Sequence, residues 1–474
     1  MLMRQTMQLK LRFLGAAQNV TGSRHMLEAD GARILIDCGL YQEREFKARN
    51  WEPFVVAPDT IDAVLLTHAH LDHCGLLPKL VRDGFKGKIY CTAATAEIAR
   101  IILLDSAKIQ EEDARYKRKR HEQEGRKGPY SYDPLYTVGE AENTFPHFST
   151  VKYNKTIQVT PGIEATFCEA GHVLGSSVIR IKAKTDGEER TILFSGDIGR
   201  PNRPIIHNPV HARPADYVLV ESTYGDRVHQ ERHDIKKALA EVINAAKKAG
   251  GNIIVPSFAL ERSQDVLYYI NELLLEDAIP HITVFLDSPM AAAITKVFKH
   301  HPELYDKQMT EFMKNHESPF DFPGLKITQS TKESKAINQK RGTFMVIAGS
   351  GMCTGGRIKH HLANNIANPK NTIMFVGYQA VGTLGRSIVN GEKEIRILGQ
   401  EYPVRARIVQ IGGFSAHADK EELLAWLKDL RKPPRKLFVV HGEEESANHF
   451  ADYVREQTGW SVEVPAYQDE FILD

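Results

Sequence analysis

The chain has few cysteines, no long apolar run and no excess of charge of one sign, and each absence excludes a class of protein. The five cysteines among 474 residues are scattered and form no Cys-x-x-Cys pair. This argues against a disulfide framework or a thiolate zinc site and favours reduced thiols in the cytoplasm. No run of about 18 apolar residues occurs, so we expect no membrane span. The net charge is only +1, so any binding to a polyanion must use a local patch.

The apolar and charged fractions, 42% and 26%, are typical of a globular protein, and the length is too great for one ordinary core. The first part of the chain is rich in short strand-like segments. From about residue 217, apolar strand-like runs alternate with helical patterns, which predicts a doubly wound parallel sheet. Short strands return near the C-terminal end. We therefore expect an α/β protein with at least two domains.

The six residues at 68–73, His-Ala-His-Leu-Asp-His, follow an apolar strand-like run. In an extended chain His68, His70 and Asp72 point to one side, and His73 breaks this alternation, so the chain must turn there. A turn would let His68 and His70 bind one metal ion while Asp72 and His73 bind a second. Imidazole nitrogen and carboxylate oxygen suit zinc, with bonds of roughly 2.0–2.2 Å. Isolated histidines are usually ordinary polar residues, but four candidate ligands in six positions favour metal.

Three later residues have the same placement, at the end of an apolar run with glycine close by. They are His172, Asp197 and His417. Sites in α/β proteins gather at the carboxyl ends of strands, where glycine permits sharp turns. Each residue alone is equally compatible with a solvated loop, so the argument depends on the joint pattern.

The segment at 108–127 is highly charged, and seven lysines and arginines lie among glutamates in its part from Arg115 to Lys127. We interpret it as a solvated helical excursion, with a contribution to polyanion binding as the alternative.

In this order, the ligand candidates resemble the successive motifs of the metallo-β-lactamase superfamily. Further segments resemble its β-CASP branch; they are 218–227, 256–264, 287–290, 349–352, 377–379 and 440–443. The resemblance implies an αββα metallo-β-lactamase sandwich that is interrupted by an inserted β-CASP domain. The expected boundaries are 1–216 for the first part of the sandwich, 217–395 for the insertion and 396–474 for the completing part.

The resemblance also implies two zinc ions. One would be bound by His68, His70 and His172, and the other by Asp72, His73 and His417, with Asp197 bridging them. The implied function is a zinc-dependent ribonuclease of RNA processing or decay, in which a hydroxide activated by the two metals attacks the phosphodiester bond. Histidine at the last motif favours RNA, because DNA-repair relatives usually have valine there, and we place this motif at His417.

One departure from the family pattern concerns the proton donor. Ribonuclease members place a histidine just after a Gly-Thr-Leu segment, partnered by the acidic motif, whereas this chain has Ser387 at that position. A serine hydroxyl cannot act as a cationic acid near pH 7, although it can hydrogen-bond a phosphate. The catalytic candidates are Asp72, Glu221, Ser387 and His441. The candidate RNA contacts are Arg262, Ser350, Thr383 and Arg386.

Three other functions stay open at this point: a DNA nuclease, a small-molecule metallo-hydrolase of the same superfamily, and a binding-only relative. The long insertion disfavours the small-molecule hydrolase, and the complete ligand set disfavours the binding-only relative. The expected substrate is single-stranded RNA. A homodimer is compatible with the sequence, no obligate protein partner is indicated, and endonucleolytic and exonucleolytic cleavage are not distinguished.

Overall fold

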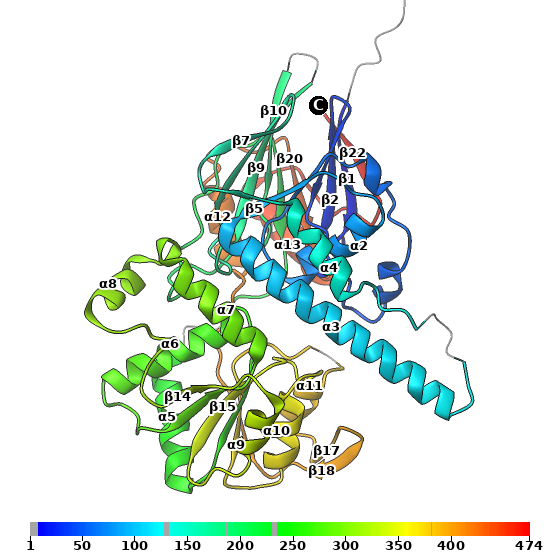
Figure 1. Ribbon diagram of the computed structural model, residues 1–474. Coiled ribbons are helices and arrows are strands. Elements are labelled where there is room, and N and C mark those ends of the chain that lie inside the picture. The colour runs from blue at the N-terminus through cyan, green and yellow to red at the C-terminus, as the bar shows by residue number, and fades with distance from the viewer. Residues whose placement is uncertain (1–7, 128–131, 186–187, 230–234, 381) are drawn as a thin grey trace, which may run out of the picture. The chain divides into compact units, whose positions relative to one another are not determined.

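The computed structural model describes residues 8–127, 132–185, 188–229, 235–380 and 382–474. They form two compact units, which we describe separately (Figure 1). Unit 1 contains the chain up to Pro201 together with Asn208–Val228 and His417–Asp474. Unit 2 contains Asn202–His207 and His229–Ala416.

Unit 1 contains two seven-stranded sheets. The first has the order β22-β1-β2-β3-β4-β5-β6. Its strands are β1 (Leu9–Gly15), β2 (Arg24–Ala29), β3 (Ala32–Ile36), β4 (Ala63–Leu65), β5 (Lys88–Thr92), β6 (Phe148–Val151) and β22 (Glu470–Leu473). The second has the order β21-β20-β11-β10-β9-β8-β7. Its strands are β7 (Thr156–Thr160), β8 (Ile163–Glu169), β9 (Ser177–Thr185), β10 (Glu188–Phe194), β11 (Tyr217–Glu221), β20 (Lys436–Val440) and β21 (Val462–Glu463).

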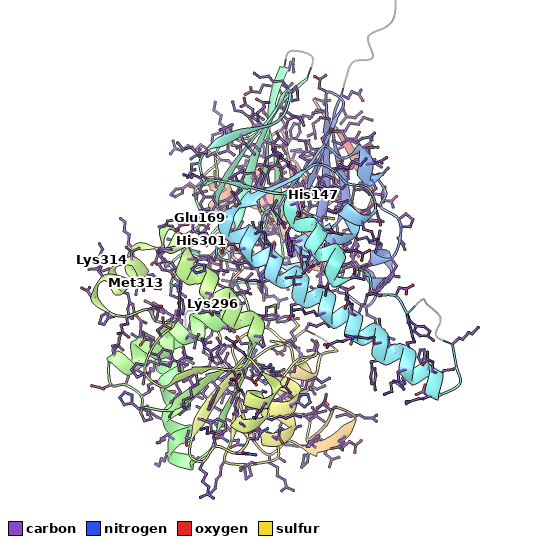
Figure 2. The ribbon with its side chains drawn as sticks, in the orientation of Figure 1. His147, Glu169, Lys296, His301, Met313 and Lys314 are labelled. Carbon is purple, nitrogen blue, oxygen red and sulfur yellow. The ribbon has the colours of Figure 1, made fainter. Side chains whose placement is uncertain are left out.

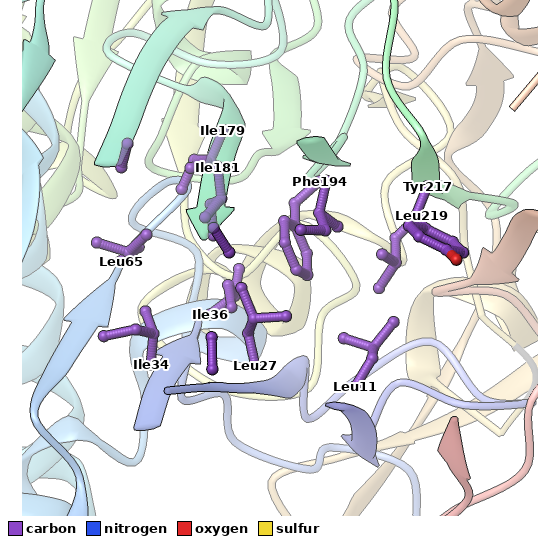
Figure 3. Packing of buried hydrophobic residues seen from close by; sticks show 14 of the residues in the cluster. Leu11, Leu27, Ile34, Ile36, Leu65, Ile179, Ile181, Phe194, Tyr217 and Leu219 are labelled. Carbon is purple, nitrogen blue, oxygen red and sulfur yellow. The ribbon is translucent and has the colours of Figure 1, made fainter. Parts of the chain in front are cut away.

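The core of unit 1 lies between these sheets, because the inward side chains of both belong to one buried cluster. Leu27, Ile34 and Leu65 of the first sheet pack with Ile179, Phe194 and others of the second (Figure 3). Helices cover the outer faces. They are α1 (Leu71–Cys74), α2 (Leu77–Arg82), α3 (Ala93–Gln123) and α4 (Val138–Thr144) beside the first sheet, and α12 (Lys420–Lys428) and α13 (Glu444–Thr458) beside the second. The predicted αββα sandwich is confirmed.

The long helix α3 has two different halves. Its first part, up to Ala107, has a buried face, whereas the residues at 115–120 are exposed on all sides of the helix. This is the helical excursion expected from the charged segment. Its binding to a polyanion stays a prediction.

Unit 2 is built on a six-stranded sheet with the order β14-β13-β15-β12-β16-β19, in which every neighbouring pair is parallel. Its strands are β12 (Ile253–Pro256), β13 (Thr283–Leu286), β14 (Leu325–Ile327), β15 (Phe344–Ala348), β16 (Thr372–Phe375) and β19 (Arg407–Gln410), and a separate hairpin joins β17 (Glu394–Ile397) to β18 (Gln400–Pro403). The helices are α5 (Ile235–Ala249), α6 (Arg262–Leu275), α7 (Pro289–His300), α8 (Lys307–Asn315), α9 (Thr331–Ile337), α10 (Ile358–Asn365) and α11 (Leu384–Val389). The predicted parallel sheet is present.

The two compact units divide after Val228 and Ala416, whereas the sequence analysis expected domain boundaries after 216 and 395. Those domain boundaries stay a prediction. Strand β11 pairs with β10 and β20 and so belongs to the sandwich. Strand β19 pairs with β16 and so belongs to unit 2.

All five cysteines are buried free thiols. None of the helices within the described ranges has both the length and the apolar character that crossing a membrane requires.

Candidate metal centre

The candidate ligands of unit 1 lie where strands of its two sheets end. His68 follows β4, His172 follows β8, Asp197 follows β10 and His441 follows β20. Glu221 is the last residue of β11. Because β10, β11 and β20 are parallel neighbours, their carboxyl ends share one edge of the second sheet.

The turn in the first histidine motif begins earlier than expected. The short helix α1 starts at Leu71 with His70 as its N-cap, so Asp72 already lies on a helical turn. His68 remains on the extended segment before it. The predicted change of direction is present, but its position is before Asp72 and not at His73.

The first candidate metal-binding group contains His68, His70, His172 and Asp197. His70 Nδ1 lies 3.0 Å from His68 Nε2 and 3.3 Å from His172 Nε2. The Oδ2 atom of Asp197 lies 3.4 Å from both His68 Nε2 and His172 Nε2. Four side chains from three separate segments of the chain therefore direct ligand atoms to one point.

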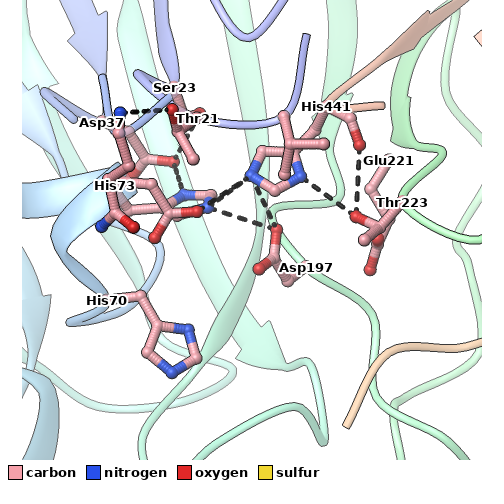
Figure 4. Close-up of polar contacts among 12 residues, drawn as sticks. Thr21, Ser23, Asp37, His70, His73, Asp197, Glu221, Thr223 and His441 are labelled. Atoms are coloured by element: carbon pink, nitrogen blue, oxygen red, sulfur yellow. Dashed lines mark hydrogen bonds and ion pairs between the residues drawn. The ribbon is translucent and has the colours of Figure 1, made fainter. Parts of the chain in front are cut away.

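The second candidate group contains Asp72, His73 and His441 (Figure 4). His73 Nε2 lies 3.0 Å from His441 Nε2, which is 3.6 Å from Asp72 Oδ2. The other oxygen of Asp197, Oδ1, lies 3.3 Å from His73 Nε2 and 3.6 Å from His441 Nε2. Asp197 thus presents one carboxylate oxygen to each group.

The donor set of both groups fits divalent metal ions. Two imidazole nitrogens that face each other at 3.0 Å can share at most one proton. Burial, together with the neighbouring charge of His73, lowers the pKa of His68 well below its usual value. Burial also outweighs the nearby Asp72 and lowers the pKa of His70 to about 4. Neutral imidazole is the form that binds metal, and both shifts of the first group favour it. In the second group burial opposes the charge of His73, but the carboxylates of Asp197 and Asp37 outweigh burial and raise the pKa of His73, so a metal ion bound there would displace a proton.

Two residues that the sequence analysis missed orient these rings. Asp37 Oδ2 accepts a hydrogen bond of 2.7 Å from His73 Nδ1, which turns His73 Nε2 toward the site. The Thr67 hydroxyl lies between Asp37 and His68 Nδ1, at 3.0 and 3.1 Å. Such outer partners fix the orientation and basicity of metal ligands. The available signal for Asp37 was a carboxylate directly after the apolar strand β3.

The loop that carries His172 is also held in place by buried polar groups. Glu169, at the end of β8 (Figure 2), accepts a hydrogen bond of 2.8 Å from Gly171 N. Burial raises the pKa of Glu169 to about 8. Ser176 Oγ accepts a hydrogen bond of 3.1 Å from His172 N.

His417, expected as a ligand of the second metal, lies in a different relation to the site. Its Nδ1 is 3.1 and 3.2 Å from the two carboxylate oxygens of Glu221 and 3.9 Å from Asp197 Oδ2. Burial opposes its charged form, but the carboxylates of Glu221 and Asp197 outweigh this and raise the pKa of His417 to about 9. The place beside Asp72 and His73 is taken by His441. Glu221 therefore has the histidine partner that the sequence analysis sought at 387 and did not find.

Ser387 and the four candidate RNA contacts all belong to unit 2. Ser387 lies on α11, whose N-cap is Thr383; the Thr383 hydroxyl accepts a hydrogen bond of 3.2 Å from Arg386 N. The Ser350 hydroxyl accepts hydrogen bonds from its own loop, from Thr354 N and Gly355 N. Arg262 is buried; its guanidinium is 3.7 Å from Asp265 Oδ2. These contacts give Ser350, Thr383 and Arg262 a local structural role, and their contact with RNA stays a prediction.

Comparison with protein families agrees with this architecture. The metallo-β-lactamase superfamily domain matches residues 26–198, the β-CASP domain matches 263–388, and the RNA specificity domain of Zn-dependent metallo-hydrolases matches 401–465. A solved protein of unknown function from Enterococcus faecalis V583 has a similar fold. It covers 98% of this chain and is itself covered over its full length, with a TM-score of 0.56 at 12% identity.

Two relatives named for their function are similar over nearly the whole chain. Ribonuclease TTHA0252 of Thermus thermophilus is 38% identical over 91% of this chain and 92% of its own length. Transcription termination factor FttA of Methanocaldococcus jannaschii is 32% identical over 94% of this chain and 69% of its own length. Because of these similarities, and because candidate metal ligands lie at the strand ends of the sandwich, we conclude that the chain belongs to the β-CASP family of metallo-hydrolases in the metallo-β-lactamase superfamily.

Proposed function

We propose that the protein is a zinc-dependent ribonuclease that hydrolyses phosphodiester bonds of single-stranded RNA. The observation that carries the proposal is the position of Asp197, whose two oxygens face two separate groups of histidines. A carboxylate between two ligand sets is the arrangement that a pair of metal ions requires. The name of the Thermus relative supports RNA as the substrate.

In this proposal one zinc ion is held by His68, His70 and His172, and the other by Asp72, His73 and His441, with Asp197 shared. Bound zinc ions supply a water of lowered pKa and positive charge for the phosphate oxygens. Asp72 combines binding with orientation of the attacking water.

The pair of Glu221 and His417 provides the proton in our proposal. Glu221 is fully buried and is fixed by Ile198 N, which donates to its Oε1 at 2.6 Å. It holds His417 by Nδ1, and we assign the His417 ring as the group that gives a proton to the departing ribose oxygen. The His417 side chain is 21% exposed, which leaves it accessible to a substrate. Ser387 is then not needed as the acid.

The histidine that separates RNA-processing members from DNA-repair members is then His441, because it completes the second ligand set. A homodimer and a cytoplasmic location stay predictions, and a contribution of Arg386 to phosphate binding is part of the proposal.

The test is the hydrolysis of a labelled single-stranded RNA, with single-stranded DNA of the same sequence as the comparison. We expect RNA cleavage that disappears on zinc depletion and returns when zinc is restored. Asp72→Ala should lower the rate by about 10³-fold, since it removes both a ligand and the group that orients the water. Undiminished RNA cleavage after zinc removal would refute the proposal, and faster cleavage of DNA would replace it by the DNA nuclease alternative.

The same assay separates the two cleavage modes. An RNA labelled at its 5′ end is compared with one whose ends are blocked. Cleavage of the blocked RNA indicates an endonuclease, and release of single nucleotides from the free end alone indicates an exonuclease.

A further inference from the structure

Unit 2 exposes two aromatic rings at the carboxyl edge of its parallel sheet. Phe258 follows β12 and is 40% exposed, and Tyr378 follows β16 and is 43% exposed. Strands β12 and β16 are parallel neighbours, so both rings stand at the same edge. This is the edge at which α/β sheets bind their ligands. Two aromatic side chains exposed at one such edge form a candidate binding surface.

The segments that carry Phe258 and Tyr378 are in contact with each other. The loop after β15 places Gly351 against the Phe258 ring so closely that a Cβ on Gly351 would lie 2.7 Å from ring carbons. A Cβ on Gly377, directly before Tyr378, would meet the same ring at 3.7 Å. Glycine at 351 therefore allows the backbone to lie directly against the Phe258 ring, and the segment of Gly377 lies within ordinary contact distance of the same ring.

A buried amide ties these segments together. Gln379 is 1% exposed, and its Nε2 lies within hydrogen-bond distance of Gly351 O (3.0 Å), Gly377 O (3.2 Å) and Tyr378 O (3.0 Å). The backbone of Phe258 is fixed separately, because its carbonyl accepts a hydrogen bond of 2.7 Å from Ser263 Oγ. Both aromatic side chains thus project from backbone that is held in place.

A positive charge adjoins this structure. The Arg386 guanidinium donates to Gln379 O at 3.4 Å through Nη1 and so lies beside the segment that carries Tyr378. An aromatic surface next to a guanidinium matches a nucleotide, whose base is flat and apolar and whose phosphate is negative.

We propose that Phe258 and Tyr378 form a platform on which unpaired bases of the RNA substrate stack, with Arg386 beside it for the adjoining phosphate. This inference rests on the proposed ribonuclease function and adds the recognition of bases to it. Stacking uses the faces of the bases, which every nucleotide offers, so the platform selects single-stranded RNA with little sequence preference. Bases within a duplex have their faces covered and are excluded.

The test is the KM and kcat for a single-stranded RNA, measured for Phe258→Ala and Tyr378→Ala. We expect KM to rise by about 5- to 150-fold, the range for one lost stacking contact, while kcat changes little. Phe258→Trp should keep the affinity, because it keeps a flat ring, whereas Phe258→Leu should lose it although it stays apolar. Met313→Ala is the matched control: Met313 (Figure 2) is an apolar residue of unit 2 with similar exposure, 37%, and lies on α8.

Abasic substrates separate stacking from a structural role. A series of RNAs with one abasic nucleotide at successive positions is tested on the wild type and on Phe258→Ala. Stacking on Phe258 requires that at least one abasic position weakens binding to the wild type and has no further effect on Phe258→Ala. Equal losses for every substrate, or an unchanged KM for both variants, would overturn the platform. If the wild type neither binds nor cleaves RNA, the ribonuclease proposal itself fails.

Discussion

Both units bury a cluster of titratable side chains, but the two clusters balance their charges differently. The histidine cluster of unit 1 comprises His68, His70, Asp72, His73, His172, Asp197 and His441. The Asp287 cluster of unit 2 comprises Asp287, Thr328, Ser334, Arg357 and His361. Each has a carboxylate at its centre, and the difference lies in what surrounds it.

In the Asp287 cluster every neighbour is a donor that the carboxylate can accept. Arg357 Nη1 donates to Oδ1 at 2.6 Å, and His361 Nε2 and Ser334 Oγ donate to Oδ2 at 2.6 Å each. The Thr328 hydroxyl donates to Oδ1 as well. Burial opposes the charge of Asp287, but these donors outweigh it and lower its pKa. Both oxygens of the Asp287 carboxylate therefore have donors, and the cluster stabilises the fold of unit 2.

In the histidine cluster, ring nitrogens face other ring nitrogens at 3.0–3.3 Å, and two facing nitrogens can share at most one proton. A buried set of acceptors is stable when a cation satisfies it. Because both clusters are buried and have perturbed pKa values, these two properties alone do not identify a metal site. The balance of donors and acceptors does.

The largest expected effect comes from removing the carboxylate at the centre of the histidine cluster. Asp197→Ala takes one ligand atom from each set, so we expect loss of bound zinc and a fall in RNA hydrolysis by about 10³-fold or more. Zinc per chain is measured by atomic spectroscopy and hydrolysis by initial rate. Full zinc occupancy in this variant would contradict a shared Asp197.

The next effect distinguishes the two histidines of the C-terminal segment. His417→Ala should lower kcat by about 10²- to 10⁴-fold, because it removes the proton donor, while zinc content stays unchanged. His441→Ala should lose zinc from the second set. The reverse outcome, with zinc lost from His417→Ala and kept by His441→Ala, would restore the original assignment of His417 as a ligand.

A smaller effect is expected at the centre of the Asp287 cluster. Asp287→Asn keeps the size of the side chain but leaves the donors facing an amide, so unit 2 should lose about 3 kcal/mol of stability. All three tryptophans, Trp51, Trp426 and Trp460, lie in unit 1, so their fluorescence reports on that unit, while circular dichroism follows both. When Asp287→Asn is unfolded with urea, we expect its circular dichroism transition to occur at a lower urea concentration than that of the wild type. Its fluorescence transition and its zinc content should be unchanged. Zinc loss would show that the two clusters are not independent.

The residues that the sequence predicted best are those whose role is local. The strand alternation of unit 1 and the parallel strands of unit 2 follow from patterns within a few residues, and so does the grouping of the candidate ligands His68, His70 and Asp72. These features depend on backbone periodicity and hydrogen bonding between near neighbours.

The residues that the sequence misplaced depend on pairing between distant segments. His417 and His441 both follow glycine-rich or apolar strand ends, and only the pairing of β20 with β11 shows which of them reaches His73. The compact units divide at other residues than the expected boundaries for the same reason, because β11 and β19 are assigned to a unit by their neighbours in the sheets. Asp37 was missed because a single carboxylate after a strand has no periodic signal.

Asp37 also gives the smallest and most selective test of the comparison. It contacts His73 and Thr67 but no candidate metal position, so Asp37→Asn should weaken zinc binding by about 10- to 100-fold through loss of ring orientation. Competition with a chromophoric chelator measures this affinity. Asp216→Asn is the control, because Asp216 accepts a hydrogen bond from Thr191 N at the opposite end of β11. If both variants bind zinc as the wild type does, the rings of the histidine cluster are held by packing alone. The metal-binding rings would then need no hydrogen-bonding partner to orient them. In the Asp287 cluster, by contrast, every contact to the carboxylate is a directed hydrogen bond.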